Sequence, residues 1–579
     1  MKKVKNIAVL LVSATILQCC SAEDPIEEYY NSADGNVTNG TIFSSQTKVS
    51  GSSELTTFTV EIDKTTAEPE QTVAAYYPDE EDNLANNTFE TEVSIDLSNP
   101  VAKTENGVTI TVNGGHVTAD HGSSKGICYV VCGETSNGSL TIVGDKKYEL
   151  LLEGVNITNP DSAAVSLLSS KRAFIVINGN NTLSDGTTSW NDHKGAFYCK
   201  GKMLVSGSGS LSVSGNYNNG IHTADYIVID RGTNIYVKST TNHGIKANDG
   251  VYINGGILNV EVSGTAAKGI NCESNIQVNG GRTTVVTTCG GEWDSDDQEA
   301  NAAAAIKCDS TYTQNGGEVL LKSTGNGGKG LRAGWEAYIN GGTLSILTSG
   351  GTYSSNNDTS SPKGIKVGTK NEHGVLEIHG GTLMVRTSGK GGEGIESKGT
   401  LTVADGTVQV SAYDDGINSA GDMTITGGSI VSVGMNSDGL DANGNMYISG
   451  GNIVAYGAGG AESGIDTGEQ YRLYVTGGSI FGIGGRIDAT IGSTTQGIVS
   501  TTASVQGNTT ITVQSGSTTM ATFVMPPYST SGTVMVSAEG MTNGNTYTID
   551  WGTTSNSVTA SESVGQSMGG GQPMGGGPR

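Results

Sequence analysis

A short strand-like segment that turns at a pair of small residues recurs through most of this chain. Each copy alternates apolar and polar residues around a Gly-Gly pair, as in Val251–Val260 (VYINGGILNV) and Ala337–Ile346 (AYINGGTLSI). A second mark, a small residue followed by Ile or Leu, recurs with similar spacing from Gly220 to Gly464. Successive copies of the first mark lie 25, 36, 25, 39, 25, 22, 23 and 27 residues apart, at Gly255, Gly280, Gly316, Gly341, Gly380, Asp405, Gly427, Gly450 and Gly477.

This period predicts the coils of a parallel β-helix. Strand-like alternation, turn residues at each repeat and the lack of a helical stripe fit a solenoid that adds one coil per repeat. Leucine-rich repeats would show a fixed Leu and Asn consensus, and propeller blades need about 40 residues or more. The 87 glycines suit sharp corners, where positive φ is accessible without a Cβ. We therefore expect an all-β, single-stranded solenoid of about 13 coils, each rising about 4.8 Å, with a small C-terminal β extension.

The charge balance argues against nucleic acid as a partner. Lys and Arg number 32 and Asp and Glu 57, giving a formal net charge of −25 that would repel a phosphate backbone. Charged residues are only 15% of the chain, against about 25% in ordinary soluble domains. The surplus of carboxylates is compatible with divalent cations.

The N-terminus resembles a bacterial lipoprotein signal. Basic residues precede an apolar stretch that ends in Leu17-Gln-Cys-Cys-Ser21, and Cys20 is the expected lipid acceptor. An ordinary secretory signal with incidental cysteines is the alternative. We expect an outer-membrane lipoprotein, anchored to the membrane by its N-terminal lipid and exposed at the cell surface, with outer-membrane proteins as further partners.

Composition and repeats divide the chain into five segments. These are a signal peptide (1–20), an acidic tether (21–88), the β-helix (89–490), the C-terminal β extension (491–562) and a disordered Gly/Met-rich tail (563–579).

Stacking turns equivalent positions of successive coils into ladders. Amides in one column can hydrogen-bond from coil to coil, which predicts a ladder of Asn254, Asn279, Asn315 and Asn340. Cys272 and Cys308 also share a column, about 4.8 Å apart, so that a disulfide and a pair of stacked buried thiols are both open. Cys128 and Cys132 are a second candidate pair.

Two early segments resemble a known family. Lys147–Asn159 (KYELLLEGVNITN) and Ala173–Asp185 (AFIVINGNNTLSD) are similar to the opening coils of a bacterial carbohydrate-binding family of pectate-lyase-like right-handed parallel β-helices. The later Gly-Ile-Lys and Gly-Gly-Thr-Leu repeats match that family too, so the resemblance covers roughly residues 100–490. The resemblance implies a right-handed solenoid that binds plant-type polysaccharide, cellulose or acidic pectic chains, with bound calcium.

Basic residues gather beside the second mark over the middle coils. We expect them to point outward and to form a stripe that would suit a polymer bearing carboxylates at regular intervals. A solvated face whose charges offset neighbouring acids is the alternative. Tyr252 and Tyr338 share an outward column in the strand before the glycine pair and would offer flat faces for sugar rings, although Tyr is also simply a good strand residue. Trp335 lies close in sequence to Lys329 and Arg332 and would strengthen a binding face there. The expected polysaccharide-binding residues are Lys246, Lys268, Lys307, Lys329, Arg332, Trp335, Lys363, Lys366, Tyr252 and Tyr338.

Farther along the chain the same positions become acidic. Stacked carboxylates repel one another unless a cation or a donor lies between them, and calcium takes six to eight oxygen ligands. The acidic columns comprise Glu393, Glu396, Asp415, Asp438, Asp441 and Asp466, of which Asp415, Asp438 and Asp441 are candidate calcium ligands. The insertion in a 36-residue repeat adds Asp294, Asp296, Asp297 and Glu299, for which a solvated acidic loop is the alternative.

Three functions are compatible with these patterns. The leading one is a surface-anchored protein that binds plant-type or acidic polysaccharide with calcium and is not an enzyme. The first alternative is a calcium-dependent, pectate-like polysaccharide lyase, which needs a cation to neutralise the uronate and a Lys or Arg to abstract a proton. The third is a non-catalytic adhesin or structural spike.

Overall fold

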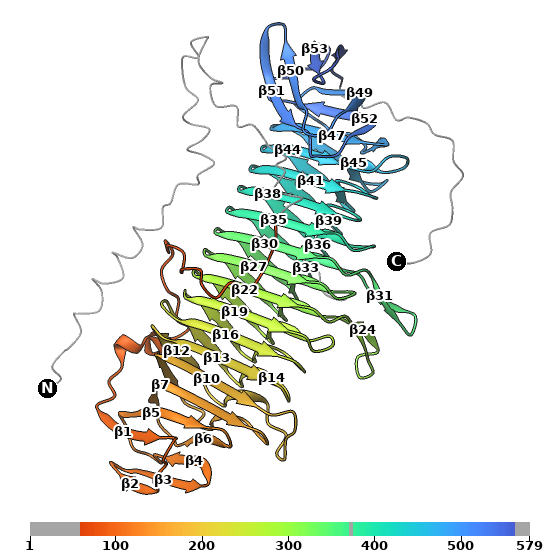
Figure 1. Cartoon of the computed structure of the whole chain (residues 1–579). Coiled ribbons are helices and arrows are strands. Elements are labelled where there is room, and N and C mark those ends of the chain that lie inside the picture. Colours follow the sequence, from red (N-terminus) through yellow and green to blue (C-terminus); the bar gives the residue numbers. More distant parts are fainter. Residues whose placement is uncertain (1–57, 370–373, 562–579) are drawn as a thin grey trace, which may run out of the picture. The chain divides into compact units, whose positions relative to one another are not determined.

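The strands of the chain stack as parallel coils. The computed structural model describes residues 58–369 and 374–561, and among these it contains strands and two 3-10 turns but no α-helix (Figure 1). The expected parallel β-solenoid is confirmed, with about 15 turns rather than 13. None of the helical segments described is long and apolar enough to cross a membrane.

The coils contribute strands to three parallel ladders, which we call faces I, II and III. Face I comprises β1 (Thr91–Asp96), β5 (Ile127–Thr135), the first half of β7 (Tyr148–Asn159), β9 (Ala173–Asn178), β12 (Met203–Gly207), β15 (Tyr226–Ile229), β18 (Gly250–Ile253), β21 (Asn275–Val278), β26 (Thr311–Gln314), β29 (Glu336–Ile339), β34 (Val375–Ile378), β37 (Thr400–Val403), β40 (Met423–Ile425), β43 (Met446–Ile448) and β46 (Leu473–Val475).

Face II follows face I in the coils from β7 onward. It comprises the second half of β7, β10 (Asn180–Asp185), β13 (Ser210–Gly215), β16 (Asn234–Ser239), β19 (Ile257–Val262), β22 (Arg282–Thr287), β27 (Glu318–Ser323), β30 (Thr343–Thr348), β35 (Thr382–Thr387), β38 (Thr407–Ala412), β41 (Ser429–Gly434), β44 (Asn452–Tyr456) and β47 (Ser479–Gly484).

Face III carries the second sequence mark. It comprises β4 (Gly115–Asp120), β6 (Gly138–Val143), β8 (Val165–Leu167), β11 (Gly195–Cys199), β14 (Asn219–Thr223), β17 (Ile245–Ala247), β20 (Lys268–Cys272), β25 (Ala304–Cys308), β28 (Lys329–Ala333), β33 (Lys363–Val367), β36 (Glu393–Ser397), β39 (Ile417–Ser419), β42 (Leu440–Ala442), β45 (Ser463–Thr467) and β48 (Arg486–Asp488).

Antiparallel elements close the ends and decorate the middle. Two hairpins are inserted between faces II and III in the long repeats, and four strands form a separate small sheet beyond the last coils. The elements are β2 (Lys103–Glu105) and β3 (Val108–Asn113) beside β4; the hairpins β23 (Glu292–Asp294)–β24 (Glu299–Asn301) and β31 (Tyr353–Ser355)–β32 (Asp358–Ser360); β49 (Ile498–Val505) and β52 (Thr530–Ser537) beside β47; and β50 (Thr510–Ser515), β51 (Thr518–Val524), β53 (Thr546–Asp550) and β54 (Ser555–Thr559).

One apolar core fills the interior of the coils. On face III the isoleucines and leucines of the second mark stack in register, as Ile270, Ile306 and Leu331 do, and all three are fully buried. The small residue before them is needed because a Cβ at Gly269 would clash with the side chain of Val285 across the core. The mark therefore reflects how closely faces II and III approach each other.

The Gly-Gly pairs form the corners between faces I and II, as the sequence predicted. The second glycine has a positive φ in each pair, for example +77° at Gly342, where a Cβ would also clash with the carbonyl oxygen of Gly317 in the preceding coil. Both the backbone conformation and the close stacking of corners thus require glycine.

The predicted asparagine ladder is confirmed at the same corner. The Nδ2 of Asn279 donates to Oδ1 of Asn254 (3.0 Å), Asn315 donates to Asn279 (2.9 Å) and Asn340 donates to Asn315 (2.8 Å). Asn254 in turn donates to Asp230 (3.0 Å). The ladder satisfies amides that would otherwise be buried without partners, since Asn254 and Asn279 are almost fully buried.

Cys272 and Cys308 lie opposite each other on β20 and β25, as their shared column predicts. Both are buried free thiols, so the stacked-thiol alternative holds and the disulfide does not. Burial raises the pKa of Cys272 to about 12, which keeps it protonated. Cys128 and Cys132 are also free and lie on one strand, β5.

Residues 58–89, which we call the N-terminal strap, pack on the outer side of face I. They are the described end of the segment expected to be a tether; Cys20, the signal peptide and the tail from residue 563 lie outside the described residues. The strap includes two 3-10 turns, η1 (Glu80–Asp82) and η2 (Leu84–Asn86). Asp82 pairs with Arg172 (2.8 Å), Tyr77 donates to Asp230 (3.1 Å), and Glu68 accepts from the amide of Gly256 (2.6 Å).

We predict that the ladder stabilises the solenoid most at its buried rungs. Asn279→Ala should lower the free energy of unfolding by about 1–3 kcal/mol, because it removes the acceptor of the Asn315 amide and one of the donors to Oδ1 of the buried Asn254. Asn340→Ala, at the exposed end of the ladder, is the matched control and should cost about 1 kcal/mol or less. Urea unfolding followed by circular dichroism measures both. An equal loss of unfolding free energy in the two variants would show that the ladder does not act as a buried network.

Candidate functional site

Two columns of charged residues run side by side along face III. Strand pairing places in register the residues of column A, which are His222, Lys246, Asn271, Lys307, Arg332, Lys366, Glu396, Asn418, Asp441 and Asp466. Column B, three positions earlier in each coil, comprises Lys268, Ala304, Lys329, Lys363 and Glu393. The predicted basic stripe thus exists as two adjacent columns, each of which turns acidic toward the C-terminal coils.

The lysines of column A are half-buried and paired to different extents. Lys246 lies 2.7 Å from Glu273, Lys307 lies 2.5 Å from Asp309, and Lys366 lies 3.9 Å from Glu396. Arg332, between Lys307 and Lys366, forms no ion pair with any described residue. Positive charge is therefore least compensated at Arg332 and Lys366.

The prediction that all these lysines point outward is wrong for the three lysines of column B, which are Lys268, Lys329 and Lys363. Each of the three is only about 5–6% exposed. For Lys268 and Lys329 the cause is the inserted hairpins, which fold over the column, whereas Lys363 is buried beside Glu393 and Glu396. The ammonium of Lys268 donates to Oδ1 of Asn301 on β24 (3.0 Å), and that of Lys329 donates to Ser360 on β32.

The buried lysines have unequal electrostatic surroundings. Burial, together with the charges of Lys307 and Arg332, lowers the pKa of Lys268 to about 7. Burial and neighbouring cations, Lys366 first among them, hold the pKa of Lys329 well below its usual value. Lys363 is different: burial opposes its charge, but the carboxylates of Glu393 (2.5 Å) and Glu396 (3.4 Å) raise its pKa. The basic and acidic parts of face III therefore meet at Lys363.

Two buried polar atoms of column A lack partners. The Oδ1 of Asn271, which lies in register between Lys246 and Lys307, accepts no hydrogen bond from the described residues, and Nε2 of His222 has none either. Burial, followed by the charges of Lys246 and Lys194, lowers the pKa of His222 to about 4, so the ring is neutral at pH 7. An acceptor and a ring nitrogen thus remain without partners beside the cations.

The acidic coils bring carboxylates together as predicted. Asp441 and Asp466 are in register on β42 and β45, and Asp415 Oδ1 accepts from the backbone amide of Asp438 (3.0 Å). Burial, followed by repulsion between these carboxylates, raises the pKa of Asp438 and of Asp441 to about 8. The pKa of Asp466 rises to about 7 by burial and by its neighbour Asp488. Protonation of these aspartates therefore stabilises the acidic coils of face III.

The candidate calcium ligands of the insertion lie on the β23–β24 hairpin. Asp294 Oδ1 accepts from the amides of Asp296 (3.0 Å) and Asp297 (3.2 Å), so it closes the turn, and Glu299 lies opposite Asp294 in the hairpin. Nowhere in residues 58–369 and 374–561 do three His, Cys, Asp or Glu side chains converge closely enough to hold a metal ion by themselves. A cation on this face would need further ligands from water or from a bound molecule.

The predicted aromatic contacts differ from one another in exposure. Trp335 is 54% exposed beside β28, and Tyr338 is half-buried. Tyr252 does not lie open to solvent as predicted: it is 9% exposed, because Tyr76 of the N-terminal strap packs on it with ring centroids 5.4 Å apart. Outward apolar residues of face I, Phe174 and Leu204 among them, form the cluster that the strap covers.

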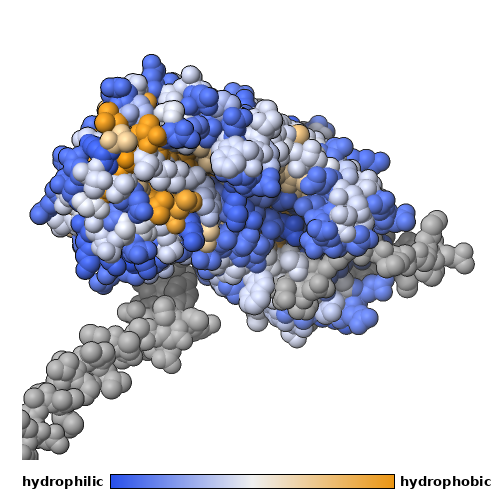
Figure 2. Space-filling view, turned by 90° about the horizontal axis from the view of Figure 1, so that it is seen from below, coloured by the Kyte–Doolittle hydropathy of each residue, from blue (hydrophilic) through white to orange (hydrophobic). Residues whose placement is uncertain are grey.

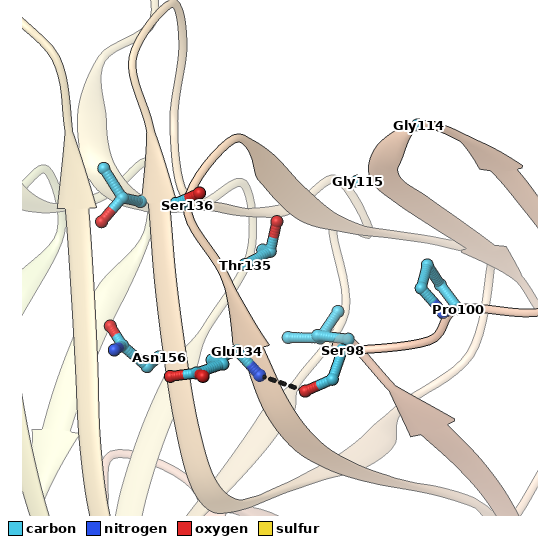
Figure 3. Close-up of a pocket in the computed structure, with 10 residues that line it drawn as sticks. Ser98, Pro100, Gly114, Gly115, Glu134, Thr135, Ser136 and Asn156 are labelled. Atoms are coloured by element: carbon cyan, nitrogen blue, oxygen red, sulfur yellow. Dashed lines mark hydrogen bonds between the residues drawn. The ribbon is translucent and has the colours of Figure 1, made fainter.

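The N-terminal coils hold two hollows that the sequence reasoning missed. One, of about 560 Å³, is lined by Ser98, Glu134 and Asn156, with the amide of Glu134 donating to Ser98 Oγ (Figure 3). The other, of about 610 Å³, lies on face III and includes Trp190 in its lining. Apolar residues gather on the surface of these coils (Figure 2). The repeat marks are weak here, so no column pointed to these residues.

Comparisons with known proteins agree on one family. The model of the family described as carbohydrate-binding domain-containing protein matches residues 104–268, 262–349, 325–433 and 371–571. A protein of Acetivibrio thermocellus with that same description is 32% identical over 121 residues, which make up 19% of this chain and 42% of that protein. The chain thus spans less than half the length of this curated relative. No solved structure matches the chain.

We predict that the stability of the acidic coils falls as pH rises from about 4 to about 8. The pKa of Asp441 is about 8 in the folded chain, against 3.8 for a free side chain, so the native state binds more protons than the unfolded state throughout this window. Asp441→Asn removes this titration and should flatten the decline in melting temperature, measured by circular dichroism. Glu539→Gln, on an exposed loop, should leave it unchanged. Identical pH profiles for Asp441→Asn and the wild type would contradict the account.

Proposed function

Because the chain belongs to the family of carbohydrate-binding domain-containing proteins, we propose that face III is its polysaccharide-binding surface and that the polysaccharide carries carboxylates. The observation that carries this proposal is the column of cations in register along β25, β28 and β33. Successive coils repeat every 4.8 Å or so, so the column offers positive charge at regular intervals to a polymer lying along the axis.

Several features of this column favour a ligand over a merely solvated face. Arg332 has no ion pair with the described residues, and Arg can hold a carboxylate through two parallel hydrogen bonds. Trp335, exposed next to β28, offers an aromatic face. The hairpins that bury Lys268 and Lys329 lie beside the column.

We propose calcium as a bridging ion on the acidic coils. The raised pKa values of Asp438 and Asp441 show that these carboxylates are desolvated and repel one another, and a divalent cation would relieve that repulsion. Since Ca²⁺ takes six to eight oxygens, uronate oxygens and water would complete the shell that the described side chains leave incomplete.

The calcium proposal predicts a pH-dependent stabilisation. Calcium should raise the melting temperature at pH 8, and EDTA should reverse the effect. Asp441→Asn should lose most of the shift, whereas Glu539→Gln should keep it. Unchanged melting of the wild type with calcium or EDTA, in the presence of polygalacturonate, would remove calcium from the account.

We also propose that the solenoid is displayed at the cell surface. The support is the lipoprotein-like signal that ends at Cys20, followed by acidic residues. Cys20→Ser should move the protein from the membrane fraction to the soluble fraction of cells; retention in the membrane would exclude the lipid anchor.

A polysaccharide lyase is the second candidate, favoured by Lys268. Its pKa of about 7 would leave a useful fraction of neutral amine. However, its ammonium donates to the carbonyl of Ala266 (2.6 Å) and to Asn301, and it lies beneath the β23–β24 hairpin. Binding without cleavage is therefore the primary proposal.

We predict that Arg332→Ala with Lys366→Ala weakens binding to polygalacturonate by about tenfold or more, since each lost charge-assisted contact is worth about 1.5–3 kcal/mol. Affinity electrophoresis at low and high salt measures the change, and wild-type binding should weaken with salt. Lys322→Ala on face II is the control and should bind as the wild type does. Ultraviolet absorbance of the same mixtures should stay flat; a rise from unsaturated products would establish the lyase instead. Equal retention of the double variant would remove the column as the binding site.

A further inference from the structure

The second hollow of the N-terminal coils is a groove on face III. It is formed by β4, β6, β8 and the loop between β10 and β11, and its volume is about 610 Å³. Thr118, Thr141 and Ser166 lie in register along its floor. The register continues from Ser166 through Tyr198 to His222, the first residue of column A. The groove is therefore the N-terminal continuation of the surface proposed to bind polysaccharide.

The chemistry of this groove is unlike that of the basic coils. Its lining contains hydroxyls, amides and one imidazole, and none of its described lining residues is Lys, Arg, Asp or Glu. Hydroxyls can both donate and accept, which suits neutral hydroxylated ligands. A carboxylate here would lose water without gaining a cation. The groove thus selects for an uncharged ligand.

Trp190 supplies the apolar surface of the groove. Its side chain is 78% exposed, and Leu168, also in the lining, is 41% exposed. Aromatic side chains with a few well-placed polar groups are typical of small-ligand sites. The exposed indole leaves an aromatic face open on the lining of the groove.

The loop that carries Trp190 is braced from several sides. His193 Nε2 lies 2.8 Å from Oδ2 of the buried Asp185, and its ring stacks on Tyr217 with centroids 4.8 Å apart. Asn191 accepts from Ser162 (2.8 Å), and the amide of Trp190 donates to the carbonyl of Asp161 (3.3 Å). The indole is thus presented by a loop that is already ordered, which reduces the entropy lost on binding.

We propose that this groove is a second carbohydrate site, which takes an uncharged pyranose segment stacked on Trp190. The C–H-rich face of a pyranose packs on the indole, while its hydroxyls bond to Thr118, Thr141 and Ser166. The inference rests on the proposed function, since it places the groove on the same polysaccharide-binding face. It adds a division of that face into a neutral end and a charged middle, so that each part recognises a different kind of sugar residue.

The test compares two uncharged oligosaccharides, cellohexaose and maltohexaose, with polygalacturonate by isothermal calorimetry on the full chain. At least one hexaose should bind the wild type, and Trp190→Ala should weaken that binding about tenfold or more while polygalacturonate binding is unchanged. Trp335→Ala, which removes the exposed Trp beside the basic coils, should retain hexaose binding. Trp190→Phe should keep part of the affinity, because it preserves an aromatic face.

The outcomes separate the two proposals. Hexaose binding without polygalacturonate binding would contradict the acidic-polysaccharide proposal but support the proposed groove site. Failure of both hexaoses to bind the wild type, or binding to Trp190→Ala as tight as to the wild type, would overturn the groove. Circular dichroism melting of each variant verifies that the coils remain folded, since Trp190 is exposed and its truncation should leave the melting temperature unchanged.

Discussion

The backbone hydrogen bonds between successive coils determine almost everything else in this structure. They hold each coil about 4.8 Å from the next in fixed register, so a position within the repeat becomes a column on the surface. The same pairing stacks the core isoleucines, brings the corner glycines into contact and aligns the asparagine amides from Asn254 to Asn340. Charged side chains at the same position of successive repeats are therefore held next to one another, and this constraint produces the electrostatics of face III.

That electrostatic pattern concentrates cations on one part of a chain whose net charge is −25. Cations are concentrated where Lys307, Arg332 and Lys366 share a column, and the excess of acids lies elsewhere. Where the basic and acidic coils meet, Lys363 and Glu393 form an ion pair with each other. Beyond it, Asp441 and Asp466 lie side by side with raised pKa values. The face is therefore neutral, basic and acidic in turn along the axis, and each part favours a different ligand chemistry.

The sequence was informative wherever the repeat was regular. The period predicted the solenoid, the positive φ of the corner glycines, the asparagine ladder and the alignment of the basic residues, because each follows from stacking alone. It did not predict the burial of Lys268 and Lys329, because the hairpins that cover them arise from insertions, and the repeat period does not say how an insertion folds. Nor did it predict the burial of Lys363, whose ammonium pairs with Glu393 and Glu396. The covering of Tyr252 by the N-terminal strap is a similar case: Tyr76 is 176 residues away in sequence. The groove at Trp190 was missed because the marks are weak in those coils.

The central claim is that polysaccharide lies on face III, along the columns. Amide hydrogen exchange of the chain, with and without saturating polygalacturonate, tests it directly, because protection is read strand by strand. The account predicts slower exchange in β25, β28, β33 and the loops beside them, with faces I and II unchanged. Protection confined to face I or face II, or no protection under conditions in which binding is saturated, would contradict it.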